Sequence, residues 1–394
     1  MRKLTVLLSV MLLIPTFSQA KTLEDLLVEK GVITKGEASA SSAGGAKVYW
    51  NGGTRVDFPD QGFTTQINTL LQTGYTYTDS DDDTGAKNTS SFDVHDARLI
   101  VSGTALHNEF YYLLEPDFVS ASDSDGEHKP RLLDAYIGWH ACDWMSVQMG
   151  QFKTGISRQY NANEWSQQFV NQSVVSDYMN LGRQEGASFS SDWMDGQVKF
   201  GAGIFNGEST GEGINRSGID TRHTVVLNAR WAAMGAMDPY VEGDIDWTDD
   251  AALNLGAAWA SSNGNNGDLE KNTTSIDANF KYQGWSFAGE YYFQTLDVTG
   301  GDNIEPQGFY TQLGYFVDPK TLEVAAQYAL LDCDDGAACG ANIEKINEVQ
   351  VSVNYYWWKN NLKAQLGWSH ENQRALEGDD VNTNKWMFEL SSYF

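Results

Sequence analysis

The chain has 394 residues, with 53 acidic and 26 basic side chains and a formal net charge of −27. A negative field of this size repels nucleic acid and disfavours anionic surfaces, so we expect no nucleic-acid partner. The composition is rich in glycine (38 residues) and aromatic residues (12%) and poor in proline (7 residues), and the mean hydropathy is −0.42. Such a chain could be a soluble or a membrane-embedded β-protein, and the strand periodicity must decide between them.

The first 20 residues predict a cleaved secretory signal peptide. Residues 1–3 form a short segment with two basic residues, residues 4–17 are mainly apolar, and the segment ends in small residues at Ala20. The apolar run is shorter than the about 20 residues that a spanning helix needs, which disfavours a retained anchor. Cleavage after Ala20 would export the chain.

Residues 21–46 are expected to form a short periplasmic N-terminal helix and a linker. Apolar residues recur at helical spacing in TLEDLLVEKGVITKGEA, where Thr22 and Asp25 are placed as a capping pair. The Ser/Ala/Gly run at 37–46 is typical of a flexible linker. Because a helix of this size is marginal alone, it either packs against a partner or remains a loose tail.

From Phe63 onward, apolar residues recur at every second position. The segment 349–357, VQVSVNYYW, alternates in this way, and so do 322–330 and 362–369. Each is about ten residues long, as expected of a strand with one lipid-facing and one lumen-facing side. No later segment has the apolar length of a spanning helix, so a membrane role requires a closed β-barrel.

Short and long connections alternate along this region. Short turns are predicted at 107–108, 141–143, 318–319 and 359–360, and long loops at 79–90, 120–129, 207–221, 261–272, 297–305, 332–343 and 374–381. This alternation is typical of outer-membrane barrels, in which periplasmic turns are short. A strand at 239–247 would leave one strand too many for both termini to be periplasmic. With 237–250 as a long periplasmic connection, about 16 strands remain, enough for an aqueous channel.

The predicted fold is therefore an all-β transmembrane antiparallel barrel over residues 47–394. Its last strand places Trp386, Phe388, Leu390 and Phe394 on one face. This end resembles the C-terminal strand of outer-membrane proteins, whose final aromatic residue is recognised by the barrel-assembly machinery.

The longest interruption of the alternation, and the candidate constriction loop, runs from residue 151 to 183. It is rich in aromatic and amide side chains such as Tyr160, Trp165 and Gln168, which argues against disorder. A connection of this length usually has a function. It either folds into the lumen and narrows the pore or caps the outer mouth, and we favour the first interpretation.

The cysteines predict a disulfide, and neither the cysteines nor the histidines predict a catalytic or metal site. Cys333 and Cys339 are close enough in sequence to form a disulfide in an oxidising compartment. A metal site there is disfavoured because no histidine lies nearby. The six histidines are scattered without a nucleophile–base motif, so we expect no catalytic residue, cofactor or metal.

Four motifs follow one another through the first half of the chain: ARL at 97–99, RLLDAYIG at 131–138, GQFK at 150–153 and GRQEG at 182–186. Their order and spacing resemble the phosphate-selective porin O and P family, over nearly the whole mature chain. The resemblance implies a homotrimer of 16-stranded barrels with the third extracellular loop folded inside. In some members, arginines in the pore and lysines at the constriction select phosphate. Carried over residue by residue, the candidates are Arg98, Lys153 and Arg183, with Arg158 inside the long loop.

The charge balance opposes the anion selectivity that the resemblance implies. Anion selectivity needs a positive lumen, whereas period two places Asp134, Glu290, Glu323 and Glu389 inward. We therefore expect a passive outer-membrane channel for small hydrophilic solutes and ions, which either favours phosphate or other anions or is general and mildly cation-preferring. Its other partners would be outer-membrane lipid and lipopolysaccharide. The alternative of another class is a secreted or surface β-protein acting as an adhesin or binding module.

Overall fold

The computed structural model describes residues 28–31, 34, 45–81, 88–122, 128–207, 223–264, 269–298, 300–334, 336, 338–339 and 342–394. The predicted signal peptide at 1–20 and most of the predicted helix and linker at 21–46 lie outside these ranges. Within that segment, Val28 and Glu29 are described and are helical.

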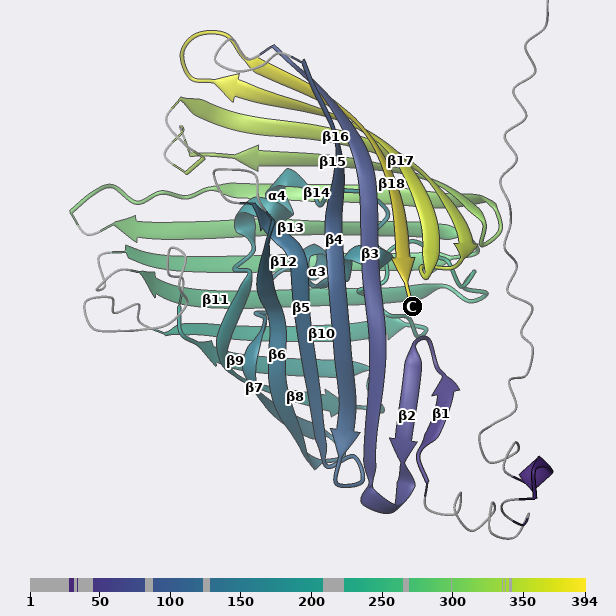
Figure 1. Ribbon diagram of the computed structural model, residues 1–394. Coiled ribbons are helices and arrows are strands. Elements are labelled where there is room, and N and C mark those ends of the chain that lie inside the picture. The colour runs from purple at the N-terminus through teal and green to yellow at the C-terminus, as the bar shows by residue number, and fades with distance from the viewer. Residues whose placement is uncertain are drawn as a thin grey trace, which may run out of the picture.

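Sixteen antiparallel strands close into a barrel, as the sequence predicted (Figure 1). Each strand pairs with the next along the chain, and β18 pairs with β3, so that the ring has no free edge. The strands are β3 (Phe63–Ser80), β4 (Asn88–Ala105), β5 (Phe110–Ser122), β6 (His128–Cys142), β7 (Met145–Lys153), β8 (Arg183–Trp193), β9 (Val198–Phe205), β10 (Thr224–Met234), β11 (Ala252–Gly264), β12 (Leu269–Tyr282), β13 (Trp285–Val298), β14 (Gln307–Asp318), β15 (Leu322–Asp332), β16 (Ile343–Trp358), β17 (Leu362–Ala375) and β18 (Val381–Tyr393).

A small hairpin precedes the barrel wall. β1 (Lys47–Trp50) pairs with β2 (Thr54–Phe58), and β2 pairs with the first residues of β3. A short 3-10 helix, η1 (Pro59–Gln61), joins β2 to β3. The closed wall itself therefore begins at Phe63.

The strands have apolar side chains outside and polar side chains inside, the reverse of a soluble barrel. In β16, Val351 is 37% exposed, whereas Ser352 and Asn354 are 1% and 0% exposed. In β15, Tyr328 is 38% exposed and Gln327 only 3%. An apolar outer face and a polar interior are what lipid outside and solutes inside require. The predicted period-two alternation is thus confirmed.

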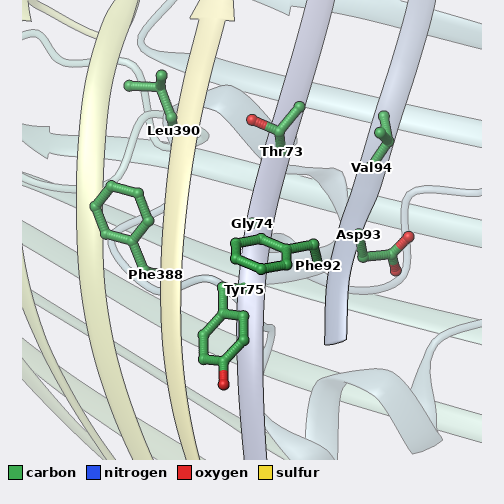
Figure 2. A pocket seen from close by; sticks show the side chains of 8 residues that line it. All are labelled: Thr73, Gly74, Tyr75, Phe92, Asp93, Val94, Phe388 and Leu390. Carbon is green, nitrogen blue, oxygen red and sulfur yellow. The ribbon is translucent and has the colours of Figure 1, made fainter. Parts of the chain in front are cut away.

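The outer face over β18, β3 and β4 has an apolar hollow of about 490 Å³ (Figure 2). Phe92 at its edge is 87% exposed, and Phe388 and Leu390 are about half exposed. Apolar side chains of this size are exposed on every side of the wall, which in water would promote aggregation. Among the described helices, none is long and apolar enough to cross a membrane.

The requirement that both termini lie in the periplasm correctly predicted the irregular connection. β10 ends at Met234 and β11 begins at Ala252, and the fully described residues 235–251 between them form no strand. We call residues 235–251 the periplasmic connection, because short turns and this connection share one end of the barrel.

Cys333 and Cys339 form a disulfide in the connection between β15 and β16, with their Cα atoms 5.4 Å apart. Cys142 is a free thiol.

Candidate pore constriction

The connection between β7 and β8, residues 154–182, lies inside the barrel, and we call it the inner loop. It contains α3 (Arg158–Asn161), η2 (Glu164–Ser166) and α4 (Val174–Met179), and Figure 1 shows α3 and α4 within the ring of strands. Ile156, Phe169 and Val175 are 0–3% exposed. The long interruption is thus packed into the lumen rather than spread over the mouth.

Lumen carboxylates hold the N-termini of both α-helices of the inner loop. Glu290 of β13 accepts hydrogen bonds from the backbone N–H groups of Arg158 (2.8 Å) and Gln159 (3.3 Å). Glu348 of β16 accepts one from Val174 N–H (2.9 Å). These N–H groups have no partner within their helices, and a carboxylate both satisfies them and complements the helix dipole. Two inward acids therefore anchor the loop.

Glu323 of β15 anchors the middle of the inner loop. Its carboxylate accepts hydrogen bonds from Gln168 Nε2 (2.6 Å), Asn354 Nδ2 (3.0 Å) and Tyr356 OH (2.7 Å), and its side chain is fully buried. Lys363 of β17 donates from Nζ to the Gln167 carbonyl. The loop is consequently bonded to the β13–β17 side of the wall.

The periplasmic connection enters the lumen from the other end and meets the inner loop. Glu242 N–H donates to the Ser166 carbonyl (3.0 Å), and Ser166 Oγ donates to the Tyr240 carbonyl (3.0 Å). Lys281 of β12 donates from Nζ to the Val241 carbonyl (2.7 Å). Two segments from opposite ends of the barrel thus fill part of the same lumen.

Arg158 joins these two segments. The side chain is 1% exposed, and Nη2 donates to Glu242 Oε1 (2.8 Å) and to Tyr310 OH (2.7 Å). Nη1 reaches the Pro239 carbonyl at 3.3 Å. The sequence placed Arg158 among the pore candidates, but the structure buries it between the two segments, away from the other three candidates. We call the contact of Arg158 with the periplasmic connection the clasp.

Those other three cations meet around Glu164 of η2. Arg98 Nη1 lies 2.9 Å from Glu164 Oε2, and Lys153 Nζ lies 3.7 Å from Glu164 Oε1. Lys153 and Arg183 are direct partners at the ends of β7 and β8, so the strand register places them side by side. Burial opposes ionisation of Glu164, but the charges of Lys153, Arg98 and Arg183 outweigh it and hold the pKa of Glu164 well below its ordinary value.

Further carboxylates surround the same cations. Arg98 Nε donates to Asp96 (2.8 Å), and Arg98 Nη1 donates to Glu115 (3.0 Å). Arg183 contacts both oxygens of Asp134, at 3.1 and 3.2 Å. Asp117 Oδ2, fully buried and without a hydrogen bond, lies 3.9 Å from Arg98 Nε. We call the eight residues the constriction cluster: Arg98, Lys153, Arg183, Asp96, Glu115, Asp117, Asp134 and Glu164.

The family model of the phosphate-selective porin O and P matches residues 66–390. The chain belongs to this family. It is therefore an outer-membrane β-barrel porin, a channel and not an enzyme. The likeness that the motifs at 97–99, 131–138, 150–153 and 182–186 suggested is confirmed, and the adhesin alternative is set aside.

Solved structures with the same fold include three porins or channels. The outer membrane channel DcaP of Acinetobacter baumannii has a TM-score of 0.62 at 11% identity, and the match covers 84% of this chain and 98% of that chain. The anion-selective porin from Comamonas acidovorans has a TM-score of 0.59 at 12% identity, with 84% of this chain and 99% of that chain covered. The trimer form of OmpT of Vibrio cholerae has a TM-score of 0.57 at 12% identity, with the same two coverages. At these identities the likeness shows the fold alone. No curated protein sequence matches the porin.

Glu115 and Asp117 are members of the constriction cluster that the sequence analysis of this porin missed. Both lie on β5, two positions apart, so their side chains face the same side of the sheet. The outward Leu114, which is 47% exposed, would have placed them inward by alternation. In the part of the chain that the structure describes, no group of His, Cys, Asp and Glu side chains could hold a metal ion.

The disulfide between Cys333 and Cys339 packs against the inner loop of the porin. Cys333 packs in one apolar cluster with Val175 and Met179 of α4, and Tyr178 OH donates to the Ala338 carbonyl (2.8 Å). The two cysteines are six positions apart. Closing so short a loop contributes about 2 kcal/mol by chain entropy.

We therefore expect reduction of this disulfide to loosen α4 while the barrel stays folded. Limited proteolysis of detergent-solubilised protein, with and without reductant, should show faster cleavage in 170–182 after reduction. Cys142→Ser, which leaves the disulfide intact, should respond to reductant as the native chain does. Cleavage rates that reductant leaves unchanged would contradict this support.

Proposed function

We propose that this porin is a homotrimeric passive channel for small hydrophilic solutes and ions, with a weak preference for cations. The observation that carries the preference is the charge of the constriction cluster. Its five carboxylates (Asp96, Glu115, Asp117, Asp134 and Glu164) outnumber its three cations (Arg98, Lys153 and Arg183). A constriction with an excess of carboxylates favours cations over anions.

Phosphate selectivity is the second candidate. The family is named for phosphate selectivity, and the Comamonas acidovorans porin is anion-selective. The gathering of Arg98, Lys153 and Arg183 around Glu164 supports it. Against it, each of these cations already pairs with a carboxylate of the chain. A neutralised cation attracts a passing anion only weakly.

The reversal potential in a KCl gradient tests this proposal directly. We expect steady single-channel conductance in planar bilayers, a potassium-to-chloride permeability ratio above unity, and no block of the current by excess inorganic phosphate. A ratio below unity with phosphate block would favour the second candidate. A folded, purified protein without conductance would contradict the channel itself.

Assembly and export complete the proposal. The trimer form of OmpT supports a homotrimer here, and the outer loops would contact lipopolysaccharide. The basic, apolar and small-residue series at 1–20 supports export with cleavage after Ala20, which leaves 21–46 in the periplasm. N-terminal sequencing of the mature protein should begin at Lys21, and mass photometry in detergent should give three copies.

A further inference from the structure

Glu164 occupies a position that a free anion would otherwise suit. Its carboxylate receives Arg98 from β4 and Lys153 from the end of β7, and the charge of Arg183 from β8 also acts on it. The three cations belong to the wall, whereas Glu164 belongs to the inner loop. The inner loop thus adds Glu164 to the four carboxylates that the wall itself contributes to the constriction cluster.

Of the three cations, Lys153 depends most on Glu164. Arg98 also pairs with Asp96 and Glu115, and Arg183 also pairs with Asp134. In the described part of the chain, Glu164 is the one carboxylate that forms an ion pair with Lys153. The other bond of Lys153 Nζ goes to the Ala162 carbonyl, 3.1 Å away in the same loop.

We propose that Arg98, Lys153 and Arg183 form a site for a small oxyanion and that Glu164 fills this site as a tethered counter-ion. The inference rests on the proposed channel function and adds the cause of its ion preference. A carboxylate and a free oxyanion present the same acceptor chemistry to guanidinium and ammonium donors. The loop carboxylate therefore excludes solute anions from the cations that would attract them.

The cations should stay in place when the charge of Glu164 is removed. Lys153 and Arg183 are fixed by the pairing of β7 with β8, and Arg98 by its bonds to Asp96 and Glu115. Glutamine has the shape of glutamate and can still accept the hydrogen bond from Arg98. Glu164→Gln should therefore leave the ammonium group of Lys153 without a counter-ion rather than remove the site.

The test compares Glu164→Gln with two matched variants by reversal potential in a KCl gradient. We expect E164Q to lower the potassium-to-chloride permeability ratio about fivefold, because one charge acts on cations and anions in opposite directions. Inorganic phosphate should now reduce its chloride current. E164D keeps the charge, so its ratio should lie closer to the native value than that of E164Q. Asp177→Asn removes an exposed carboxylate of α4, outside the constriction cluster, and should leave the ratio nearly unchanged.

A double variant separates the anion site from a simple change in net charge. Adding Lys153→Met to E164Q removes the ammonium group that has lost its counter-ion, so phosphate sensitivity should disappear and the ratio should return toward the native value. If E164Q does not fold, K153M alone still tests the proposal, because removing Lys153 should raise the cation preference. Equal shifts in E164Q and D177N, or an unchanged ratio in K153M, would overturn the tethered counter-ion. A native protein without conductance would instead refute the channel.

Discussion

Replacing Arg158 with methionine should release the inner loop from the periplasmic connection and raise the single-channel conductance. Arg158 is fully buried, and its guanidinium is the cation that pairs with Glu242. Removing one partner of a buried pair leaves the other charge desolvated and costs about 3–5 kcal/mol. Tyr310 OH and the Pro239 carbonyl lose a donor at the same time.

This loss of free energy should destabilise the packing of the two lumen segments and not the strands of the wall. The strands of the wall are paired around a closed ring, whereas the segments meet mainly through Arg158, Ser166 and Glu242. Planar-bilayer recordings should therefore show a larger and noisier current, while the heat stability of the barrel changes little. Arg374→Met is the control, because Arg374 is 57% exposed and distant in sequence. A native current in R158M would show that the clasp does not hold the segments together.

Pairing the substitution with Glu242→Met should recover part of the loss. An apolar pair of similar volume replaces a buried ion pair at little cost, whereas a single unpaired charge does not. The single-channel current of the double variant should thus lie closer to the native current than that of either single variant. An equal change of current in all three variants would assign the effect to packing instead.

Most of the barrel could be predicted because each strand shows its own pattern of alternating residues in a short stretch of sequence. A strand with lipid on one side and a polar lumen on the other alternates every second residue, and this pattern is visible without a partner strand. The requirement for periplasmic termini then identified 237–250 as a connection, and β10 and β11 indeed end and begin on either side of it. The hairpin of β1 and β2 was not foreseen, since its strands of four and five residues are too short to show a period.

The constriction cluster was predictable only where strands position it. Lys153 and Arg183 were recognised near the two ends of the loop at 151–183, and Arg98 was recognised through the family motif at 97–99. The contact between Arg98 and Glu164 joins residues 66 positions apart, and the one between Arg158 and Glu242 joins residues 84 positions apart. Both depend on the path of irregular segments, which have no period to follow. For the same reason the sequence did not indicate that the periplasmic connection enters the lumen.

Ile245→Ala should release the periplasmic connection while leaving the inner loop attached. Ile245 is 4% exposed and packs against Phe316 and Tyr356, with Val241 and Trp247 partly buried beside them. Truncating a buried isoleucine to alanine costs about 2–5 kcal/mol. Because the connection is an irregular segment outside the strand ladder, we expect this cost to appear as local opening. Hydrogen exchange should accelerate in 235–251 but not in β14–β16.

The comparison of this variant with R158M identifies which segment narrows the pore. In I245A the contact between Arg158 and Glu242 remains, so conductance should rise less than in R158M. Leu106→Ala is the matched control, since Leu106 lies in a periplasmic turn and is 57% exposed. When I245A and R158M are combined, the increases should be less than additive, because both variants release the same periplasmic connection. Full additivity would mean that the two segments restrict the pore independently.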